Sequence, residues 1–586
     1  MTWDLSKLYS GFDAPEYVHD IETLKKTAEE AVSRAWEMET VSVHALEEAI
    51  RVSERAATLA TKAMSFAQLT LAADANCESA MAAYARLLPV MNRLEEATSA
   101  LSAKLGSVAN LDELIGQSDL LKAHAFLLRR LKENARHVID PALEPTVLRM
   151  QMTGGSAWEQ LRDQLDGTHM VDITLDGEAK SLPLSAVRSM AYSADAAVRR
   201  TAYEAELAAY PKLEIPMAAC LNGIKGEALT LAELKHYDSV LDMALDGANM
   251  DRATLHALLQ AMEESLPIFR RYFRLKAKLL GYDGGLKFYD LFAPVGKAKG
   301  DYTPEDAREI LVRELGAFSP RMADMINRAF DERWIDMFPR EGKGGGAFCS
   351  GVHPLGISYV LTNFDGNFGS VSTLAHELGH AYHNECMRDM PILMADYPMP
   401  LAETASIFNE TLLAQKILEK ADRDTRIALL EQQLSDAAQV IVDIMSRYLF
   451  ESEVVARRAD STLSARELCE IMLEAQKQTY GDGLDPECLH PYMWACKSHY
   501  YSTDVHFYNF PYAFGQLFAV GVYALYEQKG AAFLPDYEKL LRSAGSGMVR
   551  DVAALVGIDV ADVNFWRGSL KVFADKLNEL EQLEGV

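Results

Sequence analysis

The chain has 586 residues, of which 49% are hydrophobic, so it can bury a large core and form more than one domain. Its 58 lysines and arginines face 85 aspartates and glutamates, and the resulting net charge of −27 argues against nucleic acid or anionic membranes as partners. Seven scattered cysteines without a C-x-x-C pair argue against a disulfide framework. The opening residues lack the features of a signal peptide, so we expect a cytoplasmic location.

Helical patterns dominate the first part of the chain. Over residues 15–136, alanine, leucine, glutamate and lysine prevail and apolar residues recur at helical spacing, which is typical of long antiparallel helices. Residues 171–184 alternate in polarity around Asp176-Gly177, which predicts a β-hairpin. Helical patterns then continue to residue 280. We therefore predict a mostly α-helical fold in two domains, residues 1–190 and 191–586.

A mixed region follows in the middle of the chain. Residues 342–349 are rich in glycine and form either a flexible loop or a loop that folds over a bound substrate. Residues 356–364 predict a strand at the edge of a small sheet, where an extended peptide could add as another strand. Residues 365–367 predict a turn, and Ser372 and Thr373 suit the start of a helix.

The helix expected after this turn carries His376-Glu377-Leu378-Gly379-His380, an H-E-x-x-H motif. Residues four apart lie on one helix face, so His376 and His380 can reach one metal ion while Glu377 is offset toward a water on it. Two imidazoles plus one carboxylate leave a fourth tetrahedral position open, which favours zinc. The motif predicts a catalytic zinc centre; the alternative is a chance match on an amphipathic helix.

A catalytic zinc site needs a third protein ligand, and two glutamates beyond a proline-rich loop are candidates. Glu403 follows His380 by 23 residues, and Glu410 returns to nearly the same face of a helix expected over residues 401–411. Such carboxylates are costly in a core unless a metal ion or the N–H of a ligand imidazole holds them; the alternative is two solvated glutamates. Cys386 stands where a compact pattern has its third histidine, but the glycine that would turn the helix is absent.

These features together resemble the oligoendopeptidase F branch of the thimet-type (M3) zinc metallopeptidases. The resemblance covers nearly the whole chain and is carried by the H-E-x-x-H motif and by residues 3–9, 289–294, 402–406 and 507–515. It implies a helical ellipsoid with a deep substrate channel, with the zinc helix at its floor and a small sheet beside that helix. Residues 1–190 would be the amino-terminal domain and residues 191–586 the catalytic domain.

The resemblance also implies a zinc-dependent endopeptidase that hydrolyses internal bonds of short, unfolded oligopeptides. His376, His380 and Glu403 would bind one zinc ion per chain, and Glu377 would be the base that takes a proton from the attacking water. Glu410 would accept a hydrogen bond from the N–H of a ligand histidine.

A late histidine–tyrosine group in this family stabilises the reacting carbonyl. We assign it to His499, Tyr508 and Tyr512. What looks like a short insertion leaves His506 as a second candidate for the histidine. The alternative role of these aromatic residues is core packing.

Two other functions remain open from the sequence. One is a zinc carboxypeptidase or dipeptidase that trims peptide ends, for which a basic anchor for a terminal carboxylate would be evidence. The other is an inactive helical peptide-binding scaffold with a structural metal. The presence of the base and of all three ligands argues against the scaffold.

Overall fold

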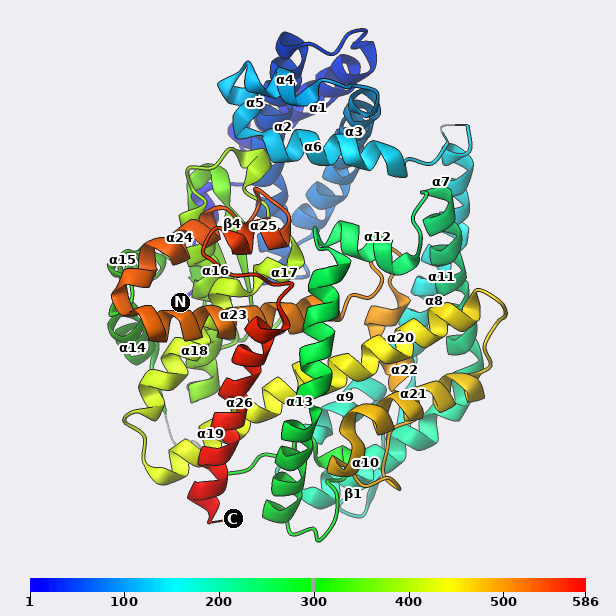
Figure 1. Cartoon of the computed structure of the whole chain (residues 1–586), viewed down its shortest axis with the longest axis vertical. Helices are drawn as coiled ribbons and strands as arrows, with labels where there is room; N and C mark the ends of the chain where they lie inside the picture. Colours follow the sequence, from blue (N-terminus) through cyan, green and yellow to red (C-terminus); the bar gives the residue numbers. More distant parts are fainter. Residues whose placement is uncertain (141, 297–300, 586) are drawn as a thin grey trace. The chain divides into compact units, whose positions relative to one another are not determined.

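The computed structural model describes residues 1–140, 142–296 and 301–585 (Figure 1). Helices dominate this part of the chain, and its only sheets have two and three strands. The predicted mostly α-helical fold is therefore confirmed. Among the described residues, no helix is long and apolar enough to cross a membrane.

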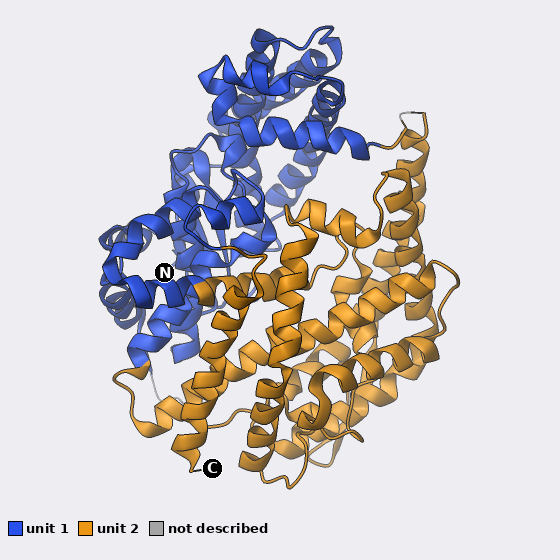
Figure 2. Ribbon diagram, viewed as in Figure 1, with its two compact units in different colours: residues 1–138, 299–417, 522–558 blue, residues 139–298, 418–521, 559–586 orange. Residues whose placement is uncertain are grey.

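The chain folds into two compact units, each assembled from three separate segments (Figure 2). Unit 1 contains residues 1–138, 299–417 and 522–558, and unit 2 contains residues 139–298, 418–521 and 559–586. Neither unit is a continuous piece of sequence, so neither can be excised by a single cut. The two domains predicted at residues 1–190 and 191–586 are a different division and stay a prediction.

Unit 1 begins with long helices, as the alanine-rich pattern predicts. Buried alanines such as Ala28, Ala31 and Ala35 let α1 pack closely on its neighbours. The helices of unit 1 before residue 510 are α1 (Pro15–Glu37), α2 (Val43–Ala73), α3 (Glu78–Gly106), α4 (Leu111–Gly116), α5 (Asp119–Ala123), α6 (Ala125–Asn134), α14 (Pro304–Gly316), α15 (Pro320–Asp331), α16 (Phe368–Cys386), α17 (Met399–Ala402) and α18 (Thr404–Leu418). Near its end the unit has α24 (Leu534–Arg542) and α25 (Val549–Ala554).

Unit 2 opens with α7 (Glu144–Thr153), α8 (Gly155–Thr168) and the predicted hairpin. Strands β1 (Met170–Leu175) and β2 (Glu178–Pro183) pair antiparallel, and Asp176 and Gly177 both have positive φ, as a tight hairpin turn requires. The later helices of this unit are α9 (Leu184–Ser189), α10 (Ala196–Ala209), α11 (Glu214–Leu234), α12 (Val240–Gly247), α13 (Arg252–Leu279), α19 (Arg423–Ala438), α20 (Ile444–Arg458), α21 (Ala465–Tyr480), α22 (Met493–Cys496) and α26 (Val563–Glu584). Helix α23 (Phe510–Lys529) contributes residues to both units.

The small sheet beside α16 has the order β3-β5-β4, with β3 (Ile335–Asp336), β4 (Phe348–Val352) and β5 (Ile357–Leu361). Strand β5 was predicted at the edge, and that prediction is wrong because β3 pairs with it in parallel and β4 pairs with it antiparallel. All five residues of β5 are buried, which suits a central strand. Among the described residues β3 and β4 each pair only with β5, so these two are the edge strands, and β4 is the longer of them.

The glycine-rich segment before β4 is anchored to the sheet by a buried lysine. The Lys343 ammonium lies 2.8 Å from a carboxylate oxygen of Asp336 and donates to the carbonyls of Phe338 and Thr362 at 2.9 and 2.6 Å. Farther along, Asn363 donates to two carbonyls of the segment. Residues 348 and 349, predicted as part of the loop, belong to β4.

Replacing Lys343 by Met should lower the melting temperature more than replacing Arg340 by Met, although both cations pair with Asp336. The Lys343 side chain is fully buried and that of Arg340 is 37% exposed. Breaking a buried ion pair costs about 3 kcal/mol, whereas an exposed pair contributes under about 1 kcal/mol. Scanning calorimetry would compare the two variants, and hydrogen exchange over residues 340–347 should accelerate only in Lys343→Met. Equal losses would argue that Lys343 does not anchor the segment.

Candidate functional site

Helix α16 carries the H-E-x-x-H motif and starts earlier than predicted. The side chain of Asn367 accepts a hydrogen bond from the Ser370 backbone N–H at 2.9 Å, which makes Asn367 the N-cap. Asp365 accepts from the Ser370 hydroxyl at 2.5 Å and supports the cap. The predicted start at Ser372 and Thr373 is therefore wrong by about one turn, because the residues assigned to the turn cap the helix themselves.

Two histidines and one glutamate form a compact cluster in unit 1. The Nε2 atoms of His376 and His380 lie 3.3 and 3.5 Å from Oε2 of Glu403. All three ligand atoms lie within 4.8 Å of one another. Ligands about 2.1 Å from a tetrahedral zinc ion are about 3.4 Å apart. The observed spacing therefore fits zinc, and it is longer than the roughly 2.8 Å of a direct charge-assisted hydrogen bond.

Glu403 reaches the histidines because the helix is interrupted between α17 and α18. It has φ −86° and ψ 4° and is the one residue between the two helices, so the continuous helix predicted over residues 401–411 is wrong. The hydroxyl of Ser406 donates to Oε2 of Glu403 at 2.6 Å and fixes that oxygen. At Gly379 the backbones of α16 and α18 approach so closely that a Cβ would lie 2.5 Å from Cα of Ser406.

Glu410 lies on the other side of the His376 ring. Its Oε1 is 3.4 Å from Nδ1 of His376, so one imidazole nitrogen faces Glu410 and the other faces Glu403. Burial acts to lower the pKa of His376, but these two carboxylates outweigh it and hold the pKa well above its ordinary value. A carboxylate on the far nitrogen also orients the ring toward the cluster.

The pKa values of the two remaining motif residues, Glu377 and His380, are shifted in opposite directions. Burial raises the pKa of Glu377 to about 7, a value suited to exchanging a proton near neutral pH. Burial lowers the pKa of His380 to about 4, which keeps its imidazole neutral and able to bind a metal. Burial would also raise the pKa of Glu403, but His376 and His380 lower it to about 2.

The alternative ligand Cys386 does not belong to this cluster. Among the described residues, Glu403 is the only one that joins the two histidines. Burial raises the pKa of the Cys386 thiol to about 12, which disfavours the thiolate that zinc would bind. The neighbouring His383 is fully buried, stacks on Tyr397 with ring centroids 4.1 Å apart and approaches the Leu541 carbonyl at 3.1 Å. Its role is in packing.

A second group of predicted residues assembles in unit 2. The ring of His499 lies 5.2 Å from that of Tyr508 and 6.0 Å from that of Tyr512, and the two tyrosine rings are 5.5 Å apart. Nδ1 of His499 is 3.3 Å from Oδ1 of Asn509, which also accepts from Arg447 at 3.1 Å. All three rings are partly exposed, so this histidine–tyrosine cluster can contact a ligand.

His506, the alternative histidine, lies apart from these rings. It is buried with Nδ1 3.5 Å from the ammonium of Lys225, and burial lowers its pKa to about 3. Lys225 forms a buried ion pair with Glu451 at 2.6 Å, and the same glutamate oxygen accepts the backbone N–H of Phe507 at 3.0 Å. This contact holds Phe507 at a φ of +53°, a conformation that is rare for a residue with a side chain.

Sequence reasoning missed the polar residues that support both clusters. Ser406 and Asn509 lie inside segments used for the prediction, and their short sequence separation from Glu403 and His499 was the available signal. Lys225 and Glu451 are 226 residues apart, so nothing local in the sequence could have paired them.

Comparisons with known proteins agree with the geometry. The sequence model of "Peptidase family M3" matches residues 189–571. The chain is 28% identical to the group B oligopeptidase PepB of Streptococcus agalactiae, over 80% of this chain and 78% of that protein. It is 29% identical to the chromosomal oligoendopeptidase F of Lactococcus lactis subsp. cremoris, over 70% of this chain and 67% of that protein. The crystal structure of oligoendopeptidase-F from Enterococcus faecium has the same fold, with a TM-score of 0.71, 18% identity and coverage of 97% and 99%.

Replacing Gly379 by Ala should disrupt the metal cluster, because the added methyl group would force α18 and Glu403 away from α16. The expected result is loss of bound metal and a melting temperature lowered by several degrees, from overpacking that costs about 1–3 kcal/mol. The matched control is Gly568→Ala in α26, where the new methyl group meets nothing within 4 Å. That variant should keep its metal and become slightly more stable. A Gly379→Ala protein with full metal content would contradict the close-approach argument.

Proposed function

Because the chain belongs to peptidase family M3, we propose that it is a zinc-dependent endopeptidase that cleaves internal bonds of short, unfolded oligopeptides. The observation that carries the proposal is the cluster of His376, His380 and Glu403, whose ligand atoms have the spacing of a tetrahedral zinc site next to Glu377. We assign one zinc ion per chain to this cluster. The related proteins named as oligopeptidases and oligoendopeptidases support the substrate class.

Each residue of the cluster has a defined task. His376 and His380 would hold the metal through Nε2, and Glu403 would hold it through Oε2. Glu410 accepts from Nδ1 of His376 and keeps that ring in the tautomer that binds metal. Zinc bound to such a donor set supplies Lewis acidity, which activates water and polarises a carbonyl group.

Glu377 moves the proton. Its carboxylate takes a proton from the attacking water and then delivers it to the nitrogen of the leaving amine. A pKa of about 7, raised by burial, allows both transfers near neutral pH. Glu377 follows His376 directly but does not belong to the cluster of possible ligands, so it remains available for this task.

The histidine–tyrosine cluster of unit 2 completes the proposal. As the carbonyl oxygen of the scissile bond becomes negative, a hydroxyl of Tyr508 or Tyr512 donates a hydrogen bond to it. Burial and the nearby guanidinium of Arg447 lower the pKa of His499, so its ring is neutral and can donate through one nitrogen. We assign this role to His499 and not to His506, which is buried against Lys225.

The end-trimming and scaffold functions have no observation of their own in this structure. All seven cysteines are free thiols, which fits a reducing environment. On that basis we propose a cytoplasmic location.

Replacing Glu377 by Gln should abolish hydrolysis of a quenched peptide blocked at both ends, while zinc stays bound. Loss of a general base typically lowers the rate by about 10²–10⁴-fold. Glu385→Gln on the same helix, where the carboxylate pairs with Arg328, is the matched control and should keep both zinc and activity. Turnover and zinc content are measured for each protein. A Glu377→Gln enzyme with normal turnover would refute the assignment, and wild-type cleavage of unblocked peptides alone would indicate end trimming.

Replacing Tyr508 or Tyr512 by Phe should lower kcat without loss of zinc and with little change in KM. Removing one donor to a developing oxyanion costs about 10²–10³-fold in kcat. Tyr501→Phe is the control, because Tyr501 is buried and its hydroxyl has no hydrogen-bond partner in the described structure. Steady-state kinetics on the blocked peptide would show the difference. If both cluster variants match Tyr501→Phe, the two tyrosines only pack.

A further inference from the structure

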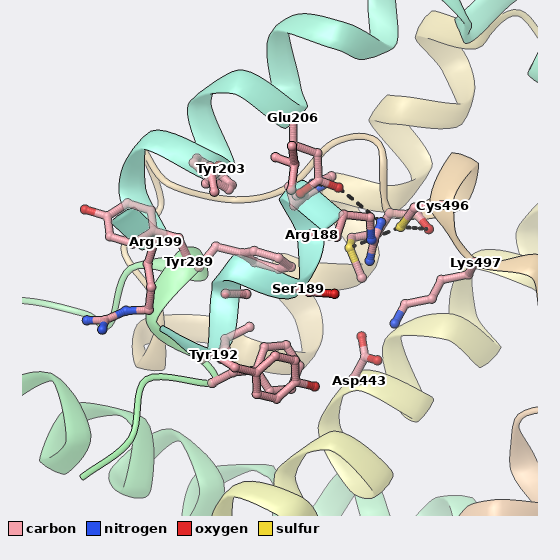
Figure 3. A pocket seen from close by; sticks show the side chains of 18 of the residues that line it. Arg188, Ser189, Tyr192, Arg199, Tyr203, Glu206, Tyr289, Asp443, Cys496 and Lys497 are labelled. Carbon is pink, nitrogen blue, oxygen red and sulfur yellow. Dashed lines mark hydrogen bonds and ion pairs between the residues drawn. The ribbon is translucent and has the colours of Figure 1, made fainter. Parts of the chain in front are cut away.

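Unit 2 contains a cavity of about 330 Å³ that the proposed peptidase chemistry does not use. Its lining comes from α9, α10 and the connection after α22, together with residues 288–292 and the segment around Asp443 (Figure 3). Ligand sites in proteins typically have about 300–1,000 Å³, so this cavity can hold one small molecule.

The carboxylates that line the cavity already have arginine partners. Asp166, Glu206 and Asp443 pair with Arg162, Arg188 and Arg447, respectively. The lining cation Arg199 pairs with Asp290 at 2.7 Å, and both side chains are buried. Each of these four carboxylates thus has an arginine that balances its charge.

Lys497 is the exception. Its side chain extends into the space between Ser189 and Asp443, and within the described structure its ammonium makes no hydrogen bond or ion pair (Figure 3). Asp443, which Figure 3 shows beside it, already forms an ion pair with Arg447. Burial lowers the pKa of Lys497, and the attraction of the Asp443 carboxylate does not overcome this effect. The cavity thus holds one ammonium group that forms no ion pair of its own among the described residues.

Arg188 supplies a second cationic group on the same side of the cavity. One guanidinium nitrogen, Nη1, donates to Glu206 at 3.1 Å and to the Tyr210 hydroxyl at 3.2 Å. Arginine has five N–H donors, so the guanidinium retains donors beyond those that Nη1 uses. A guanidinium and an ammonium are each strong hydrogen-bond donors to a carboxylate.

Several aromatic rings form part of the remaining wall. The rings of Tyr192 and Phe292 lie 4.7 Å apart, and Tyr203, Tyr289 and Phe288 also line the space. An apolar cavity of about 150 Å³ is enough to hold benzene, so a ring with a small substituent fits here.

We propose that this cavity is a binding site for a small organic carboxylate with a flat apolar body, with Lys497 and Arg188 binding the carboxylate and the aromatic wall covering the body. The charge of the ligand neutralises Lys497, and its size is limited by the cavity to about one ring and a short chain.

Isothermal titration of the full-length, zinc-loaded protein with benzoate tests the proposal. Benzoate should bind saturably with a Kd in the low millimolar range or tighter. Benzamide, which has the same shape without the charge, and acetate, which has the charge without the ring, should each bind at least 10-fold more weakly. Equal binding of benzoate and benzamide, or no saturation by about 20 mM benzoate, would overturn it.

Lys497→Met locates the site. It should weaken benzoate binding at least 10-fold without lowering the melting temperature, because Asp443, the carboxylate beside Lys497, keeps its ion pair with Arg447. Lys571→Met on α26, where the lysine is 72% exposed, is the matched control and should bind benzoate normally. Benzoate binding that survives in Lys497→Met would place the ligand elsewhere, for example at the metal cluster, and would refute this site. The titration needs no peptide turnover, so its outcome does not depend on the endopeptidase assignment.

Discussion

The candidate metal site depends on how closely α16 and α18 approach each other at Gly379. One helix can present two ligands four residues apart, but it cannot turn a third side chain toward the same point. The third ligand has to come from another element, and here that element touches α16 where glycine leaves no Cβ. The break between α17 and α18 then directs Glu403 at the two histidines, and Ser406 holds its carboxylate. The geometry of the site thus follows from a backbone contact.

The electrostatics of the site follow from this crowding. Glu403 and Glu410 flank His376 and raise its pKa, which favours a proton on that ring. One proton offsets only one of the two negative charges, whereas a divalent cation would match both carboxylates while both imidazoles stay neutral. Burial is the main reason why the pKa of Glu377 is raised to about 7, and the negative charges of Glu403 and Glu410 add to this effect while His376 opposes it.

Sequence reasoning predicted the helical fold and the hairpin at Asp176-Gly177 from short-range patterns. It selected His376 and His380 from their spacing and Glu403 from a family resemblance, and the structure brings these three side chains together. It misplaced features that depend on specific strand pairing or side-chain contacts. Strand β5 has an apolar run typical of a strand, but its central position depends on the two-residue β3, which is too short to detect. The start of α16 was predicted at Ser372, because the sequence does not show the hydrogen bonds by which Asn367 and Asp365 cap the helix at Ser370. The cavity around Lys497 has no sequence pattern, since its lining runs from residue 166 to residue 497.

The choice between His499 and His506 shows most clearly what the sequence lacks. Both histidines precede tyrosines at short spacing, and no local rule separates them. The difference arises from Glu451, which accepts the N–H of Phe507 and pairs with Lys225 in the core of unit 2. That contact fixes a backbone with positive φ directly after His506, and His506 lies buried beside the lysine. The later part of the short segment between the two histidines can then lie at the protein surface, while the ring of Tyr508 packs against that of His499. A buried ion pair distant in sequence therefore decides which histidine joins the tyrosines, just as a glycine contact decides which glutamate joins the H-E-x-x-H motif.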